Sequence, residues 1–214
     1  MTAKLIPYGD HAILIQWPAQ GFSISVSDHI HGLTKILSET EMFTEVVPGY
    51  DSILCVFDLS KLDPAIARQS IETCLNAYDQ TDITSGKTIN ISVQYGGENG
   101  PDMQTICESS GLSEDEVIAL HSRQEYRVCM MGFIPGFTFL SPAPEKLHHP
   151  RLATPRAKVP AGSIGIANWQ TGIYGLESPG GWQIIGRTTD VIFDANRDTP
   201  FLLNAGDNIR FVPQ

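Results

Sequence analysis

The sequence predicts an α+β protein of two domains, a ferredoxin-like domain over residues 1–96 and a compact β-barrel or sandwich over residues 97–214. Three observations support this prediction. Segments at strand and helix spacing alternate in the first part of the chain, whereas short apolar segments separated by Gly and Pro fill the second part. A glycine-rich run, Gly96–Pro101, lies between them and is the best candidate for a linker.

The elements of the first domain are expected in the split β-α-β order of ferredoxin-like proteins. Apolar runs on both sides of Tyr8-Gly9-Asp10 predict two strands and a turn. Ser25–Asp28 has the pattern of a capping box before a helix, and Asp63-Pro64 is typical of the start of a second helix. In chain order we expect two strands within residues 5–17, a helix through residue 37, strands at residues 46–47 and 53–57, a helix over residues 63–78 and a strand over residues 89–95.

The second domain is expected to open with two short helices, over residues 102–108 and 114–122. Ser113 and Glu116 have the spacing of a capping box for the second of them. Short apolar segments bounded by turn residues then predict strands at residues 126–130, 163–167, 182–185, 191–193 and 208–212. This even spacing of short strands favours a barrel or sandwich.

The charge of the chain argues against two classes of partner. The chain has 24 acidic and 14 basic side chains, a formal net charge of −10, which disfavours binding to nucleic acid or to an anionic membrane surface. The acidity belongs to residues 1–120, with 17 acidic and 5 basic side chains, whereas residues 121–214 have 7 acidic and 9 basic ones. No Asp or Glu lies between Lys146 and Leu176.

We expect a soluble cytoplasmic protein without a bound metal. The N-terminus lacks a basic start followed by a long apolar run, and the longest apolar stretches are too short to span a bilayer. The four cysteines are widely spaced without a C-x-x-C pair, which favours free thiols in a reducing compartment. His29 and His31 are two residues apart on a predicted helix, so they point to different sides and cannot share a metal ion. His148-His149 lies in a predicted loop without further residues to complete a ligand set.

The segment from Pro135 to Gly165 is the strongest candidate for a binding site. Its six prolines can make a long loop rigid, and Arg151, Arg156 and Lys158 form a cationic cluster without nearby acids. Such a cluster suits a carboxylate, a phosphate or an acidic partner. The alternative is a solvated loop whose bases pair with the acidic first half of the chain.

Three further patterns have a functional and a structural interpretation. Ser163, within Ala161–Gly165, is similar to a nucleophile elbow, but no histidine follows it, so a turn or a backbone-amide loop is favoured. Ser85–Thr88 is similar to the end of a nucleotide P-loop, but Thr81 stands where Gly is needed and a strand is expected to follow. Aromatic residues among glycines are expected in the barrel core, with an aromatic-lined pocket as the alternative; these are Phe133, Phe137, Phe139, Tyr174 and Trp182.

Several long motifs resemble the allophanate hydrolase subunit 1 family, whose members include a 5-oxoprolinase component and the KipI-type kinase inhibitors. The resemblance covers essentially the whole chain and is carried by Gly132–Phe137, Pro150-Arg151, Thr154–Arg156, Val159–Ala167, Gln170–Tyr174, Ser178–Thr188 and Leu202–Phe211. It implies a ferredoxin-like domain followed by a cyclophilin-like β-barrel.

The resemblance also implies an activity. It points to the B-type subunit of an ATP-dependent 5-oxoprolinase, which opens 5-oxo-L-proline to L-glutamate together with a homologous cyclophilin-like C-type subunit and a third, A-type subunit. It leaves two alternatives, a binding module that inhibits a histidine kinase and a carboxyltransferase half-subunit of a biotin-dependent urea carboxylase or allophanate hydrolase system. The chain has no biotin-attachment Met-Lys-Met and no nucleotide motif, so we expect an ATP site shared with partner subunits.

On this basis we expect Arg156 and Lys158 to hold a carboxylate or phosphoryl group, with Gly162 and Ser163 offering backbone amides. The expected catalytic residues are Arg156, Lys158 and Ser163. The expected substrate- or partner-binding residues are Phe133, Pro135, Phe137, Arg151, Pro160, Ala161, Gly162, Gln170, Thr171, Gly180, Gly181 and Trp182.

Overall fold

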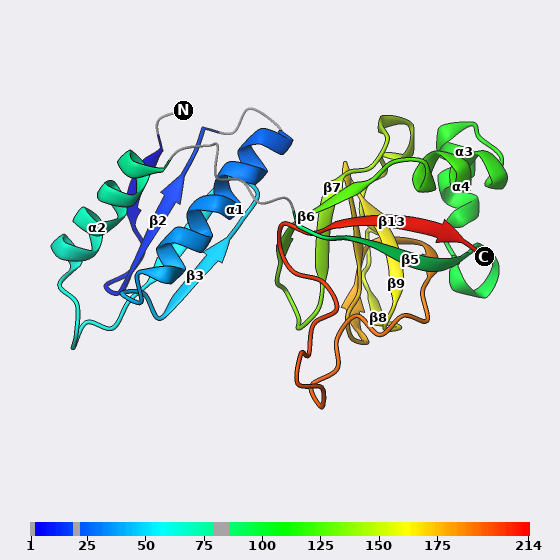
Figure 1. Cartoon of the computed structure of the whole chain (residues 1–214). Coiled ribbons are helices and arrows are strands. Elements are labelled where there is room, and N and C mark those ends of the chain that lie inside the picture. Colours follow the sequence, from blue (N-terminus) through cyan, green and yellow to red (C-terminus); the bar gives the residue numbers. More distant parts are fainter. Residues whose placement is uncertain (1–2, 19–21, 79–85) are drawn as a thin grey trace. The chain divides into compact units, whose positions relative to one another are not determined.

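The computed structural model describes residues 3–18, 22–78 and 86–214. The chain divides into two compact units, residues 1–85 and residues 86–214, each with its own apolar core (Figure 1). Thr81 and Ser85 lie outside the described residues, but Thr88 begins a strand, so the strand expected after Lys87 is confirmed. Both units combine strands with helices, which confirms the predicted α+β class.

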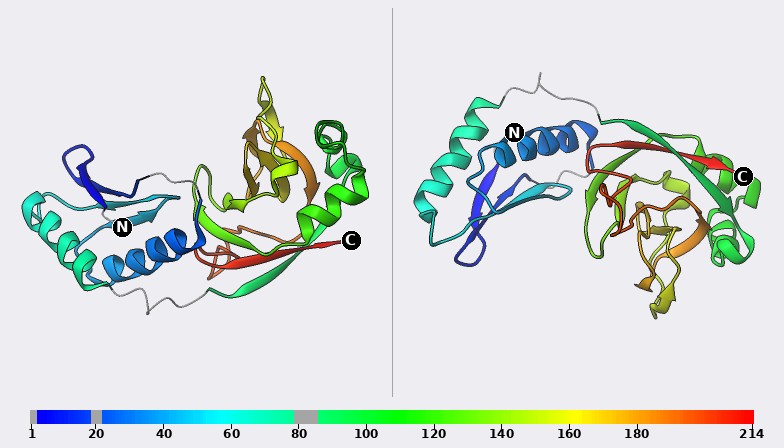
Figure 2. Two further views of the ribbon diagram at one scale, coloured as in Figure 1. Left: turned by 90° about the horizontal axis from the view of Figure 1, so that it is seen from above. Right: turned by 60° about the horizontal axis from the view of Figure 1, so that its bottom comes forward.

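The first unit is a four-stranded sheet with two helices. Its elements are β1 (Lys4–Pro7), β2 (Ala12–Gln16), α1 (Ile24–Glu39), β3 (Glu45–Pro48), β4 (Ser52–Val56) and α2 (Pro64–Ala77). The strand order is β1-β2-β4-β3, and every neighbouring pair is antiparallel. Since β4 is antiparallel to both β2 and β3, those two strands run in the same direction and α1 connects them in a split β-α-β unit. Figure 2 shows α1 and α2 on the same face of this sheet.

The two helix starts of this unit have different outcomes. Oδ1 of Asp63 accepts a hydrogen bond from the backbone N–H of Ala65 over 2.7 Å, with Pro64 in the first turn, so the predicted cap of α2 is confirmed. The predicted capping box at Ser25–Asp28 is wrong, because α1 begins at Ile24 and these residues already form its first turns. The apolar spacing predicted the existence of this helix but not its first residue.

The second unit is a closed barrel of seven strands. The strands are β5 (Thr88–Tyr95), β6 (Tyr126–Met131), β7 (Thr138–Pro142), β9 (Ser163–Ala167), β10 (Gln170–Ile173), β12 (Gln183–Arg187) and β13 (Asn208–Pro213). They are ordered β10-β7-β6-β13-β5-β12-β9, and the pairing of β9 with β10 closes the ring. The barrel alternative is therefore confirmed over the sandwich.

Shorter elements flank the barrel. These are η2 (Gly97–Asn99), α3 (Met103–Ser110), α4 (Glu114–Ser122), η3 (Glu145–Leu147) and the paired strands β8 (Arg156–Val159) and β11 (Ser178–Gly180). The capping box of α4 is confirmed, because the hydroxyl of Ser113 accepts from the N–H of Glu116 and the carboxylate of Glu116 accepts from the N–H of Ser113.

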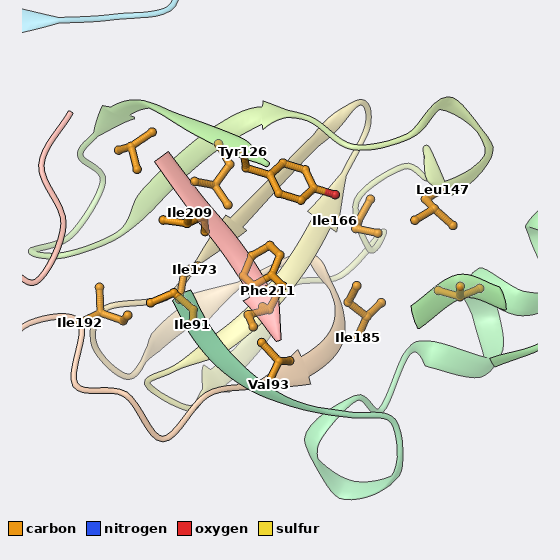
Figure 3. Close-up of a cluster of buried hydrophobic side chains, with 14 of the residues drawn as sticks. Ile91, Val93, Tyr126, Leu147, Ile166, Ile173, Ile185, Ile192, Ile209 and Phe211 are labelled. Atoms are coloured by element: carbon orange, nitrogen blue, oxygen red, sulfur yellow. The ribbon is translucent and has the colours of Figure 1, made fainter. Parts of the chain in front are cut away.

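The strand over residues 89–95 belongs to the barrel and not, as the sequence suggested, to the first domain. β5 pairs in parallel with β13, from Thr88 opposite Asn208 to Val93 opposite Pro213. Ile91 and Val93 lie in the barrel core beside Phe211 (Figure 3). The run Gly96–Pro101 is accordingly a turn within the second unit, where the N–H of Gly96 donates to the carbonyl of Ile185 over 3.0 Å.

Of two other predictions, one is wrong and one is confirmed. The strand predicted at residues 191–193 is wrong, since only an isolated bridge between Phe193 and Phe201 forms there. All four cysteines are free thiols, as expected, and two of them, Cys55 and Cys129, are buried. No helix within the described ranges is long and apolar enough to cross a membrane.

Candidate functional site

Arg156, the first residue of β8, is engaged in a half-buried ion pair. Its Nη2 donates to Oδ1 of Asp102 over 2.6 Å, and its Nη1 donates to the carbonyl oxygen of Trp182 over 3.3 Å. The other carboxylate oxygen of Asp102 accepts from the backbone N–H of Ile184 over 2.6 Å. The side chain of Asp102 is only 8% exposed, so separating the pair would leave a nearly buried charge without its partner. Arg156 therefore links β8 to β12 and to the start of α3.

The other two bases of the predicted cluster also have partners. Nζ of Lys158 lies 2.9 Å from Oε1 of Glu177, and both side chains are well exposed. The guanidinium carbon of Arg151 lies 5.9 Å from the centre of the Trp182 ring, in a cation–π contact. An exposed ion pair stabilises a protein by about 1 kcal/mol or less, so Lys158 can exchange Glu177 for another anion at little cost.

The turn from Pro160 to Ser163 is fixed by its own backbone hydrogen bonds. The N–H of Gly162 donates to the carbonyl of Tyr174 over 2.8 Å, and the N–H of Ser163 donates to the carbonyl of Pro160 over 3.3 Å. Both amides that were expected to hold an anion are therefore already used. Ser163 is buried, and none of the described histidines hydrogen-bonds to its hydroxyl, so the geometry of an activated nucleophile is not present.

Most of the predicted aromatic residues form a small second core of the barrel. The ring centre of Phe137 lies 4.8 Å from that of Tyr174 and 5.3 Å from that of Trp182, and all three side chains are buried. Phe133 is different, because its side chain is 69% exposed and its backbone has a φ of +71°. With Pro135 and Phe201 it lines an open hollow of about 330 Å³.

The remaining predicted residues contribute to packing and backbone hydrogen bonds of the barrel. Gln170 begins β10 half-buried, next to the fully buried Thr171. The carbonyl of Gly181 accepts a hydrogen bond from the N–H of Leu152 over 2.7 Å. A side chain at Gly180 would collide with the hydroxyl of Tyr174, because its Cβ would lie 2.2 Å from that oxygen. Gly180 therefore allows the close approach of Tyr174, whereas Gly181 contributes a backbone hydrogen bond to the loop at residues 150–156.

The sequence did not predict a buried histidine in α4, His121, which contacts side chains of the barrel strands. Nε2 of His121 lies 3.0 Å from the hydroxyl of Thr171, and Nδ1 lies 2.8 Å from the hydroxyl of Tyr95. Because Thr171 donates its hydroxyl proton to the carbonyl of Gly165 over 3.0 Å, it accepts from His121, which leaves Nδ1 to accept from Tyr95. Complete burial lowers the pKa of His121 to about 3, so the ring is neutral at physiological pH.

A cavity of about 500 Å³ on the barrel lies beside the predicted segment. It includes the predicted Ala161 and Gly162, and its polar lining comprises Gln94, Asn99, Arg187, Thr188, Thr189 and Asp190. Arg187 is the last residue of β12, and its Nε donates to the carbonyl of Ala161 over 2.9 Å. The sequence contains Arg187 within the motif Ser178–Thr188, but nothing in that local pattern marks it as a binding residue.

The described residues contain no cluster of three or more His, Cys, Asp or Glu side chains that could hold a metal ion. The structure thus separates the predicted site into three parts. Arg156 and the buried aromatic residues stabilise the barrel, Phe133 and Pro135 line an apolar hollow, and Ala161 and Gly162 border the polar cavity with Arg187.

The chain is similar to known proteins over almost its whole length. Residues 3–203 match the family model described as "Carboxyltransferase domain, subdomain C and D". The chain is 41% identical to the B-type subunit of 5-oxoprolinase from Escherichia coli, covering 99% of this chain and 96% of that protein. It is 33% identical to the B-type subunit of 5-oxoprolinase from Bacillus subtilis, covering 95% and 90% of the two chains.

Some solved structures and a distant relative are longer proteins, and this chain matches only a part of each. The crystal structure of TTHA0988 superposes with a TM-score of 0.83 and 32% identity, over 95% of this chain and 40% of that one. "Urea amidolyase" of Saccharomyces cerevisiae is 21% identical over 96% of this chain, which corresponds to 13% of that protein. The chain belongs to the carboxyltransferase-domain family of subdomains C and D, and it is a homologue of the B-type subunits of 5-oxoprolinase.

Proposed function

We propose that this chain is the B-type subunit of an ATP-dependent 5-oxoprolinase complex, which opens 5-oxo-L-proline to L-glutamate. The observation that carries the proposal is the 41% identity to a B-type 5-oxoprolinase subunit that is matched over 96% of its own length. An end-to-end match at this level concerns both units and their connection, and not only a shared barrel. Fold alone would not be a sufficient argument, because one fold serves many activities.

The two domain folds implied by the sequence resemblance are consistent with this proposal. We infer that residues 86–214 form a cyclophilin-like barrel, which implies no prolyl isomerase activity. We also infer that residues 1–85 form a ferredoxin-like domain in which β1 occupies the sheet position that a strand after α2 would otherwise take. The support for this inference is the split β-α-β unit of β2, α1 and β3, with β4 between the two strands.

The reaction needs more than the described residues of this chain supply. Hydrolysis of a stable amide with ATP is expected to begin with transfer of the γ-phosphoryl group to the amide oxygen, which releases ADP. Water then attacks the carbon, the ring C–N bond breaks with the nitrogen leaving as the protonated amine, and the phosphate is released. That requires a nucleotide site, cations near the phosphoryl group and a base. We therefore propose that the ATP site is shared with a homologous C-type subunit and an A-type subunit, and that the complex acts in the cytoplasm. TTHA0988 supports the idea of a neighbouring segment, because this chain corresponds to only 40% of that one.

Within this complex, we propose that Lys158 and Arg151 contribute to an anion- or partner-binding surface. Lys158 is exposed, and Glu177, also exposed, is the one carboxylate among the described residues that pairs with it. Arg151 lies over the ring of Trp182. Arg156 acts on the same surface as a positioning residue, since its guanidinium is occupied by Asp102 and the carbonyl of Trp182.

Reconstitution tests the proposed function. The chain is mixed with the products of its neighbouring genes, and glutamate and ADP formed from 5-oxoproline and ATP are measured. We expect glutamate only when this chain, its partners and ATP are all present. Equal glutamate formation without this chain, or none with the complete set of subunits, would contradict the proposal.

The two alternatives have weaker support. The urea carboxylase alternative has a match of only 21% identity, to a segment that is 13% of the yeast urea amidolyase. A kinase-inhibiting module is favoured by one observation, the exposed Phe133 over the apolar hollow with Pro135 and Phe201. Inhibition of a histidine kinase by the purified chain, with no glutamate formed by the assembled subunits, would favour that module instead.

A further inference from the structure

The cavity of about 500 Å³ beside Arg187 has the size of a small-molecule site. It lies entirely within the second unit, between the ends of β5 and β12, the turn before β9 and the chain at residues 188–193. Its walls come from segments far apart in sequence, so no single motif reveals it. The chemistry of its lining decides which kind of ligand it fits.

Arg187 is an exposed residue that one backbone hydrogen bond orients, and its terminal N–H groups make no hydrogen bond within the described residues. Its Nε–H donates to the carbonyl of Ala161 over 2.9 Å, which orients the planar guanidinium. No carboxylate in the described part of the chain forms an ion pair with it. Arg151, Arg156 and Lys158, by contrast, all contact a ring or a carboxylate. A guanidinium that is positioned but not neutralised suits a carboxylate or phosphate ligand.

The turn that orients Arg187 is itself built tightly. Gly162 has a φ of +81°, and a Cβ there would lie 2.3 Å from the carbonyl oxygen of Thr188. The N–H of Thr188 donates to the carbonyl of Gly162 over 2.9 Å. The close approach of these two segments therefore fixes Ala161, and through it the guanidinium of Arg187.

The other polar groups of the cavity fit an amide rather than a second anion. Nδ2 of Asn99 donates to Oε1 of Gln94 over 3.1 Å, which leaves the NH₂ group of Gln94 as a donor and Oδ1 of Asn99 as an acceptor. Oδ2 of Asp190 accepts from the N–H of Ser92 over 3.0 Å and from the hydroxyl of Thr188 over 3.2 Å. Its Oδ1 remains able to accept from a ligand N–H.

Charge separates two candidate ligands. The cavity has one cation, Arg187, and one anion, Asp190, so its lining is neutral overall. A nucleoside triphosphate has several negative charges and needs several cations or a row of backbone N–H groups. A monocarboxylate with a neighbouring amide needs one cation, one acceptor for its N–H and one donor for its carbonyl oxygen, which this lining provides.

We propose that the cavity binds a small monocarboxylate bearing an amide, with Arg187 holding the carboxylate. The identification of this ligand as 5-oxo-L-proline rests on the proposed function; the carboxylate site itself rests on the geometry of Arg187. Asp190 accepts the ligand N–H, and Gln94 donates to the amide oxygen.

Binding to the full chain and to the reconstituted complex tests the proposal. The probes are 5-oxo-L-proline, 2-pyrrolidone, which has the same ring without the carboxylate, and ATP. In wild-type protein we expect saturable binding of 5-oxo-L-proline, at least about tenfold weaker binding of 2-pyrrolidone, and no competition by ATP at this cavity. Binding is followed by the chemical shifts of the residues that line it.

Variants assign the binding to the arginine. Arg187→Gln should weaken 5-oxo-L-proline binding and raise its KM in the complex at least about tenfold, and Arg187→Lys should restore part of the loss. Arg210→Gln is the matched control, because Arg210 is an exposed barrel arginine whose Nε lies 3.0 Å from Glu125. It should bind like the wild type. Thermal unfolding of each variant verifies that the barrel is folded.

The outcomes separate the site from the proposed function. Wild-type affinity and KM in a folded Arg187→Gln variant would overturn the site even if the complex makes glutamate. Equal binding of 2-pyrrolidone and 5-oxo-L-proline would overturn it as well, as would the absence of binding in both chain and complex. If the complex forms no glutamate but the chain binds 5-oxo-L-proline in an Arg187-dependent way, the site stands and the proposed function fails.

Discussion

Arg156 and Arg187 both belong to the barrel, but their guanidinium groups have different surroundings. Arg156 contacts Asp102 over 2.6 Å, whereas Arg187 uses one N–H for the carbonyl of Ala161. The residue type alone predicts anion binding for both. Only the position of Asp102, which is 54 residues before Arg156, shows that the first of them is already paired.

The Asp102–Arg156 pair is expected to stabilise the barrel. Asp102→Asn and Arg156→Ala should each lower the free energy of unfolding by about 1–3 kcal/mol, because each leaves a poorly exposed polar group without its partner. Since both changes break one interaction, the double variant should lose much less than the sum of the two. Denaturant unfolding of the four proteins measures this coupling.

A matched control is Lys158→Ala, which removes an exposed ion pair and should change stability by less than about 1 kcal/mol. Additive losses in the double variant would show that Arg156 and Asp102 act independently. In that case the guanidinium of Arg156 would be available to bind an anion directly.

His121 should make the folded protein less stable in mild acid. Its pKa is about 3 in the fold, against 6.5 for an exposed histidine, so below pH 6.5 the unfolded chain binds a proton that the folded chain does not. The stability that the buried neutral His121 contributes is fully present above pH 6.5. As the pH falls from 6.5 toward 3, the free energy of unfolding decreases by about 1.4 kcal/mol per pH unit.

The free energy of unfolding, measured from pH 7 to about pH 4.5, tests this expectation. His121→Gln should be less stable at neutral pH but should fall less steeply with decreasing pH than the wild type. His148→Gln, a change at an exposed histidine, is the control and should follow the wild type. Parallel curves for wild type and His121→Gln would show that His121 is not the buried neutral group described here.

At the scale of elements, the turn before β9 depends on one glycine. Gly162→Ala should lower the free energy of unfolding by more than about 2 kcal/mol, since both its φ of +81° and the carbonyl of Thr188 oppose a Cβ. Gly97→Ala is the control, because Gly97 has a φ of +52° but nothing within 4 Å of its Cβ, and about 1 kcal/mol is expected. Equal losses measured by thermal unfolding would contradict the close contact with Thr188.

Elements were predictable where their signals are local. The caps of α2 and α4 consist of side chains within three residues of the helix start, and both are confirmed. β5 was assigned to the wrong domain because its parallel partner β13 lies more than 100 residues later in the chain. Strands β7, β8, β10 and β11 were not predicted, because prolines and glycines interrupt the strand pattern there and neighbouring strands decide the pairing.

In the candidate site, too, local sequence signals were informative and contacts between distant segments were not predictable. The sequence motifs located a region in which Ala161 and Gly162 do border the polar cavity. The roles of individual residues depended on contacts between distant segments, such as Asp102 with Arg156 or Thr171 with His121. No local pattern contains those contacts.

At the scale of the whole molecule, the chain has two compact units with separate apolar cores, and its net charge of −10 disfavours binding to nucleic acid. The polar cavity lies wholly on the barrel, and its lining suits one carboxylate and one amide better than a triphosphate. In the proposed complex, the groups that bind ATP therefore come from outside this cavity. We therefore propose that partner subunits complete the active site.

The most direct test of this central claim is the coupled formation of ADP and glutamate by the reconstituted complex, with and without this chain. We expect both products to appear together from 5-oxo-L-proline and ATP only when the chain is present. Glutamate at an unchanged rate without the chain, or ADP without glutamate in the complete complex, would contradict the claim.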